Sequence, residues 1–270
     1  MDRQEVGSGD RRPATSNRQD SRRLPVARCV LPVACCLFLL SSLPALTSCE
    51  RPRATREELA RQSEAYPAIL SAVESDRARL AAEWRAAAGG QEETRVLDRA
   101  RDALGLMLAD RILPAWNGTP WSLGGTATGP GENPIACGYF VSTALEHAGL
   151  RVERRRLGQQ AAENIVRSVV PADRVARFRR APLDLFLDSV ASGGDGVYIV
   201  GLDYHVGFLV IQGGATFFHH ASRQAGQVVR EPAALSRALA TSSYRVVGKL
   251  FDRGLARTWL AGSAIPTHLN

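Results

Sequence analysis

Lysine is almost missing from this chain of 270 residues. Lys249 is the only lysine among 34 basic residues, and all the others are arginine. This bias indicates the composition of the genome rather than a chemical requirement. Residues 1–48 hold seven arginines and four acidic residues, so the remaining 222 residues carry only +4 of the net charge of +7. A surface this weakly basic does not support a nucleic-acid partner, and we expect none.

The sequence also lacks a long uninterrupted hydrophobic run. Its most apolar stretch, residues 29–45, contains two prolines and two serines. It falls short of the roughly 20 apolar residues that a membrane-spanning helix needs, which excludes a multi-pass membrane protein. Hydrophobic residues make up 45% of the chain and charged residues 23%, so wholesale disorder is excluded as well.

Arginines at positions 22, 23 and 28 precede the apolar stretch, which is the layout of a secretory signal. The stretch leads into Leu-Thr-Ser-Cys at 46–49, which resembles the lipobox of bacterial lipoproteins. The resemblance implies cleavage before Cys49 and lipid attachment to Cys49; the alternative is an ordinary anchor or an uncleaved helix. We therefore expect residues 1–48 to be a signal peptide and residues 49–53 to be the lipidated cysteine and a short tether. The chain would then be an exported lipoprotein on a bacterial membrane, in the periplasm or at the cell surface.

Cysteine is scarce beyond this segment. Of the five cysteines, only Cys137 lies after Cys49. A lipidated Cys49 leaves Cys137 without a partner for a disulfide bond. An unpaired thiol in an exported protein is either a small buried hydrophobic residue or a nucleophile.

Residue patterns divide the rest of the chain into a helical first part and a strand-rich second part. Helices are predicted at 54–88, with a break or kink at Pro67, and at 92–112. A loop at 117–134 precedes a helix at 137–150. Shorter helices are predicted at 157–168, 182–191 and 233–240, and strands at 197–200, 206–211, 216–220, 227–230 and 244–250. This order predicts an α+β fold with an antiparallel sheet. It comprises a helical region at 54–116, a domain at 117–252 and a C-terminal tail at 253–270.

Five segments of the second part, taken together, resemble the NlpC-type cysteine peptidases, a papain-like family. They are Gly-Thr-Pro-Trp-Ser-Leu-Gly-Gly-Thr at 118–126, Cys-Gly-Tyr-Phe-Val at 137–141, Gly-Asp-Gly-Val-Tyr-Ile at 194–199, His-Val-Gly-Phe-Leu-Val at 205–210 and Phe-His-His-Ala-Ser at 218–222. The resemblance implies a papain-like NlpC-type domain at 117–252. In it, Cys137 is the nucleophile, His205 the general base and His220 the residue that orients His205.

The chain departs from the family at three positions near the implied nucleophile. It has Ala136 where the family usually has an acidic residue, Gly138 where it has serine, and Trp121 where it has tyrosine. Trp121 and Gly138 stand at positions that face substrate in the family. The departures leave the cysteine and histidine positions of the family intact. They therefore affect the expected identity of the substrate more than the expected reaction.

The residues themselves also favour thiol chemistry. Cys137 begins a predicted helix, where free N–H groups and the helix dipole stabilise a thiolate, so we expect its pKa to lie below the usual value of about 8.5. His147 lies about 15 Å along the same helix, too far to act as a base, and is expected at the surface or as a cap. No close pair of metal ligands has the usual spacing, so we expect neither a metal nor a cofactor.

Two adjacent histidines compete for the place beside His205. Neighbouring residues of a strand point to opposite faces, so only one of His219 and His220 faces His205. Periodicity does not choose between them. The resemblance selects His220 and leaves His219 as a structural or solvent-facing residue.

The resemblance implies hydrolysis of a peptide bond in the stem peptides of cell-wall peptidoglycan, through a thioester on Cys137. Two alternatives stay open: the same fold acting on another amide, thioester or lipid acyl substrate, and an inactive wall-binding lipoprotein. The arginine-rich residues 151–180 are expected to form a solvated face. The sequence gives no indication of the oligomeric state.

The lipid anchor can be tested directly. Cys49→Ser removes the only atom that can take the lipid, so the variant is expected to leave the membrane fraction and to lose fatty-acid labelling. Detergent partitioning of the two proteins measures this. Equal partitioning of the wild type and Cys49→Ser would contradict the lipoprotein interpretation.

Overall fold

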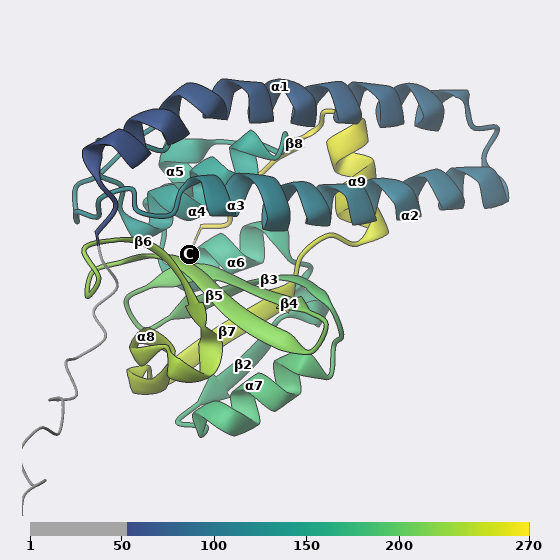
Figure 1. Cartoon of the computed structure of the whole chain (residues 1–270). Coiled ribbons are helices and arrows are strands. Elements are labelled where there is room, and N and C mark those ends of the chain that lie inside the picture. Colours follow the sequence, from purple (N-terminus) through teal and green to yellow (C-terminus); the bar gives the residue numbers. More distant parts are fainter. Residues whose placement is uncertain (1–52, 270) are drawn as a thin grey trace, which may run out of the picture. The chain divides into compact units, whose positions relative to one another are not determined.

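A six-stranded antiparallel sheet forms the middle layer of the fold (Figure 1). The structure is a computed structural model and describes residues 53–269, which all lie in one compact unit. In spatial order the strands are β2 (Ala176–Arg179), β7 (Tyr244–Lys249), β3 (Gly196–Leu202), β4 (Val206–Gln212), β5 (Ala215–Ser222) and β6 (Gln227–Pro232). The predicted α+β class and antiparallel sheet are confirmed.

Helices cover both faces of the sheet, which explains why β3 and β4 are apolar almost without alternation. Residues Val197 and Ile199 of β3 face one core, whereas Tyr198 and Val200 face another. The first core is closed by α4 (Cys137–His147) and α6 (Ala162–Val169), and the second by α7 (Leu183–Ala191) with the short α8 (Arg237–Thr241). Almost every residue of β3 and β4 is therefore buried whichever way it points.

Two long helices and one short one pack together above the sheet (Figure 1). They are α1 (Arg56–Ala86), α2 (Gly90–Leu106) and α9 (Arg253–Leu260), and α9 contacts both of the others. A π-helical turn (Met107–Ile112) and α3 (Leu113–Ala115) continue α2. The remaining elements are α5 (Arg154–Gly158), two 3₁₀ turns (Ala172–Arg174 and Ala233–Leu235) and the paired parallel strands β1 (Arg151–Val152) and β8 (Ala264–Ile265).

Two expectations from the sequence change here. Of the predicted break or kink at Pro67, the break is wrong: α1 is continuous, because buried side chains hold it on both sides of the exposed proline. The segment after residue 252 is not a loose tail. Asp252 caps α9 by accepting a hydrogen bond from the Leu255 N–H, and Trp259 of α9 is buried with its indole N–H donating to the Ala148 carbonyl at 2.8 Å.

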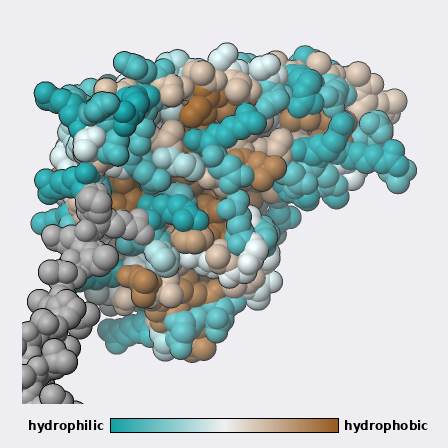
Figure 2. Space-filling view, viewed as in Figure 1, coloured by the Kyte–Doolittle hydropathy of each residue, from teal (hydrophilic) through white to brown (hydrophobic). Residues whose placement is uncertain are grey.

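The visible surface carries its hydrophobic side chains in separate small patches among hydrophilic ones (Figure 2). Within residues 53–269 no helix combines the length and the apolar character that crossing a bilayer requires. The expected signal peptide and Cys49 lie outside the described residues.

The packing of α9 predicts a large loss of stability when its buried ring is removed. Trp259→Ala is expected to lower the free energy of unfolding by about 3–5 kcal/mol, because it leaves a large cavity and orphans the Ala148 carbonyl. Leu269→Ala, at a position 44% exposed, is the control and should change it by less than about 0.5 kcal/mol. Denaturant titration measures both, and equal midpoints for Trp259→Ala and the wild type would show that α9 does not hold the fold together.

Candidate active site

Cys137 is the first residue of α4, as the sequence predicts. The preceding residue, Ala136, has extended backbone and no side chain that could cap the helix. The first N–H groups of α4 are therefore left for other partners. Cys137 is partly buried and is the only cysteine among the described residues.

The loop at 117–134 holds the approach to Cys137 in place. The Ile135 N–H donates to the Pro120 carbonyl, and the Ala136 N–H donates to the Gly125 carbonyl, both at 2.9 Å. Gly125 has to be glycine, because a Cβ there would lie 2.6 Å from the backbone of residues 134 and 135. The chain just before the thiol is thereby fixed by backbone contacts alone.

The same loop is also attached to the sheet. The Trp121 N–H donates to the Gly226 carbonyl at 2.9 Å, just before β6, and Trp121 pairs with Ile135 through an isolated bridge. Trp121 therefore lies between β6 and the segment that leads to Cys137. Its side chain is half-buried, and its indole N–H forms no hydrogen bond with any part of the chain that the structure describes.

Arg154 ties this loop to α4 from the other side. Its guanidinium donates to the Thr143 hydroxyl at 2.7 Å and to the Thr126 and Ala127 carbonyls at 2.7 and 2.6 Å. Within the arginine-rich segment, this side chain is a structural brace rather than part of a solvated face.

His205 and His220 are brought together at the start of β4. The His205 Nε2 and His220 Nδ1 atoms are 2.7 Å apart, and the two rings meet edge to face. His220 is buried, whereas His205 is partly exposed at the end of the turn between β3 and β4. The predicted pairing of His205 with His220, rather than with His219, is present in the structure.

Gly207 makes this contact sterically feasible. The pairing of Phe208 with His219 across β4 and β5 sets the register and brings Gly207 opposite His220. A Cβ on Gly207 would lie 2.7 Å from the Phe218 ring and 2.9 Å from the His220 Cβ. The bare backbone at this position leaves room for both rings beside His205.

Glu231 extends the pair to a third group that sequence reasoning missed. The His220 Nε2 lies 3.1 Å from the Glu231 Oε1. The predicted strand ends at residue 230, whereas β6 continues to Pro232 and places Glu231 on the face of His220. Only the register between β5 and β6 reveals this neighbour, so no local sequence signal could have found it.

Cys137 adjoins this histidine pair through the backbone of Val206, the residue after His205. The N–H groups of Val206, Gly138 and Cys137 all favour the thiolate. Among the described residues, the thiol makes no hydrogen bond to His205. Such bonds are often long in a ligand-free enzyme and shorten only with substrate bound.

Burial sets the charge state of both groups. It raises the pKa of the Cys137 thiol and outweighs the three N–H groups that act in the opposite direction. Burial, together with the neighbouring His220, lowers the pKa of His205 to about 3. The expectation of a lowered thiol pKa is therefore wrong for the free chain, because it counted the helix terminus but not the loss of water. At neutral pH the resting pair is an uncharged thiol and an uncharged imidazole.

The structure also locates two other histidines. His219 is buried, which fits the structural alternative of the prediction; its Nδ1 has no partner, and burial lowers its pKa to about 3. His147 is not a surface residue or a cap. Its Nδ1 lies 2.9 Å from the Tyr66 hydroxyl, which in turn accepts a hydrogen bond from the Trp116 indole at 3.0 Å. These contacts join the end of α4 to α1 and to Trp116, and they engage His147 in packing.

Gly138 allows α4 to pack closely against α5. It is buried, and a Cβ there would lie 2.1 Å from the Gly158 carbonyl oxygen of α5. The serine usual in the resembled family would not fit, so the close approach of α4 and α5 accounts for this departure. The expected role of Gly138 in substrate binding stays a prediction.

No match was found in comparisons with family models, curated proteins and solved structures. The site has to be interpreted from its own geometry. Within residues 53–269 no group of three or more His, Cys, Asp or Glu side chains could hold a metal ion.

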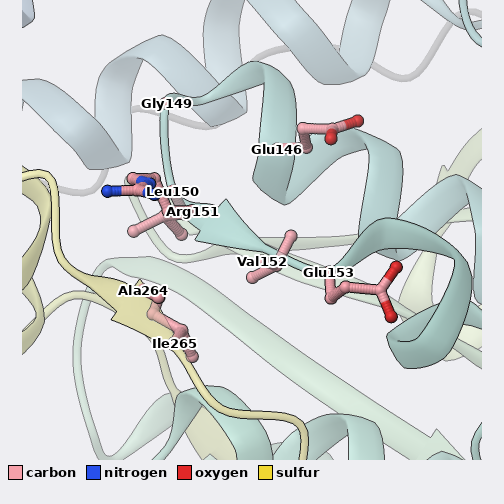
Figure 3. A pocket seen from close by; sticks show the side chains of 8 residues that line it. All are labelled: Glu146, Gly149, Leu150, Arg151, Val152, Glu153, Ala264 and Ile265. Carbon is pink, nitrogen blue, oxygen red and sulfur yellow. The ribbon is translucent and has the colours of Figure 1, made fainter.

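Two hollows elsewhere on the surface do not include the site. A groove of about 930 Å³ lies between α2 and the ends of β3, β4 and β7. A smaller one of about 460 Å³ lies between the end of α4 and strands β1 and β8 (Figure 3). Neither is lined by Cys137, His205 or His220.

The charge state of the thiol predicts how fast Cys137 is alkylated. Because only the thiolate reacts, the rate with iodoacetamide should rise with pH through a midpoint above the value of about 8.5 for a free cysteine. The native protein is assayed by mass spectrometry across a pH series, with a short cysteine peptide as the control. A midpoint below that of the peptide would show that a thiolate is already formed in the free chain.

Proposed function

We propose that the chain is a hydrolase that uses Cys137 as nucleophile and His205 as general base, with His220 holding His205. The observation that carries this is the short His205–His220 contact beside a lone thiol at an uncapped helix start. An imidazole pair of this kind, with His220 buried and His205 partly exposed, has a lone pair to offer and a fixed orientation, which is what a thiol needs from its base.

The uncharged resting pair suggests a concerted first step. As the Cys137 sulfur attacks the substrate carbonyl, the thiol proton passes to His205 Nδ1 and the new S–C bond forms. In this proposal the N–H groups at the start of α4, together with the Trp121 indole N–H, stabilise the oxyanion. The C–N bond then breaks, and the proton on His205 passes to the leaving amine, which leaves a thioester.

Water completes the cycle through the same base. His205 takes a proton from the water as its oxygen attacks the thioester carbonyl. The S–C bond breaks, the acid product leaves, and the proton returns to the sulfur. Neither a metal nor a cofactor is required for these steps.

The substrate that we propose is a peptide bond in peptidoglycan stem peptides, and its support is the resemblance of residues 117–250 to the NlpC-type peptidases. A second candidate, another amide, thioester or lipid acyl substrate, is favoured by Trp121 and Ala136. These residues replace a phenol and a carboxylate close to the thiol, so they alter the groups that a substrate meets.

Hydrolysis of purified peptidoglycan tests the proposal. The mature protein should release new amine ends, detected by mass spectrometry. Cys137→Ala and His205→Ala should each lower the rate by at least about 10³-fold, because nucleophile and base act as a unit. His220→Ala should lose most activity, and His220→Asn should retain part of it, since an amide oxygen can accept the bond from His205.

His268→Ala is the matched control, because His268 lies on the C-terminal segment and its backbone bonds to Ser168, away from Cys137. This variant should keep the wild-type rate. Binding of peptidoglycan without cleavage, by both the wild type and Cys137→Ala, would instead support an inactive wall-binding protein. Cleavage that survives Cys137→Ala would contradict the proposed nucleophile.

A further inference from the structure

We infer that Glu231 is a positioning residue that fixes the tautomer of His205 through His220. The inference rests on the proposed function, because it assigns Glu231 a part in preparing the base for Cys137. It concerns which nitrogen of His205 carries the proton before substrate binds.

The argument starts at the carboxylate. An ionised carboxylate accepts hydrogen bonds but cannot donate them. The His220 Nε2, which is 3.1 Å from the Glu231 Oε1, must therefore carry a hydrogen to make that contact. In a neutral His220 the lone pair is then on Nδ1.

The hydrogen bond between the two histidines then determines the tautomer of His205. In this neutral tautomer of His220, Nδ1 lies 2.7 Å from His205 Nε2 and accepts a hydrogen bond from that nitrogen. His205 is uncharged because burial lowers its pKa to about 3, and it therefore has only one N–H. Its lone pair is left on Nδ1, the nitrogen that does not contact His220.

Without the Glu231 carboxylate as acceptor for His220 Nε2, the hydrogen bond between the two histidines could run in the opposite direction. His220 would then donate from Nδ1 to His205 Nε2, and His205 would hold its hydrogen on Nδ1. In that state His205 could not take a proton from Cys137 through Nδ1. Glu231 therefore selects the direction of the His205–His220 hydrogen bond that leaves the lone pair of His205 on Nδ1, where it can accept the proton of Cys137.

The surroundings suit this role. The His220 side chain is 2% exposed and the Glu231 side chain 26%, so the contact is shielded from water on one side only. Phe218 stacks on the His220 ring, with centroids 4.2 Å apart and an angle of 19° between the planes, which opposes rotation of the ring. A negative charge two groups away also stabilises His205 once it becomes cationic during the reaction.

Substitution of Glu231 tests the inference. Glu231→Gln keeps the size of the side chain, but its amide can donate as well as accept, so it no longer enforces one direction. Glu231→Ala removes the carboxylate. Both variants should lower the rate of peptidoglycan cleavage by about 10- to 100-fold, in the range of other groups that act through a neighbour. Nitrogen-15 NMR of the His205 ring should change from a proton on Nε2 alone to a mixture of tautomers.

Glu163→Gln is the matched control. Glu163 is a similarly exposed carboxylate, at 30%, and accepts hydrogen bonds from Arg177 and Tyr244 away from the site. This variant should keep both the rate and the His205 spectrum. Thermal unfolding of all three variants verifies that they are folded.

The outcomes separate this inference from the proposed function. A folded Glu231→Gln that keeps both the wild-type tautomer and the wild-type rate would overturn the inference and leave Cys137 catalysis standing. A further outcome is that the His205 tautomer changes in Glu231→Gln while the wild type cleaves no peptidoglycan. That result would support the positioning role and contradict the proposed function.

Discussion

The arrangement around Cys137 depends on one hydrogen bond, between His205 and His220. It crosses from the start of β4 to the middle of β5, and it exists only because the register of the two strands places His220 opposite Gly207. With any side chain at Gly207, the Phe218 and His220 rings would have to move away. A single glycine and a single strand register therefore decide whether the chain has an oriented base.

Burial determines how such a base can act. It raises the pKa of Cys137 and lowers that of His205, so the pair rests without charge. In the proposed reaction, a proton then has to move at the moment of attack, and the tautomer of His205 matters more than it would for a preformed ion pair. A protonated thiol is also less easily oxidised than a thiolate. If the chain is exported as the sequence predicts, the burial that keeps the thiol protonated would also protect Cys137 from oxidation.

Local patterns in the sequence predict the elements that carry this site. The loop, the helix start at Cys137 and the strands that hold His205 and His220 all lie where residue types and turns indicate. The choice of His220 over His219 came from the resemblance, because two neighbours on a strand look equivalent until the register is known. Buried His219 shows that both faces of β5 are covered, which alternation alone cannot reveal.

The missed features depend on contacts between distant segments. Glu231 reaches His220 only through the pairing of β5 with β6, and Gly138 is explained only by the backbone of α5. The sequence predicts the helix start at Cys137. It does not predict that packing buries the thiol and so raises its pKa. A local signal for α9 is present in the sequence. Asp252 is a capping residue, and the buried residues Ala256, Trp259 and Leu260 follow it on one helix face. Because the helix is short, a tail was predicted for this segment.

The most direct test of the account is to trap the acyl group on the thiol. Wild-type protein mixed with peptidoglycan fragments and quenched in acid should carry an added mass on the peptide that contains Cys137, and hydroxylamine should remove it as it does any thioester. Hydrolysis that proceeds with no such adduct, or an adduct on another residue, would contradict the central claim that Cys137 forms the covalent intermediate.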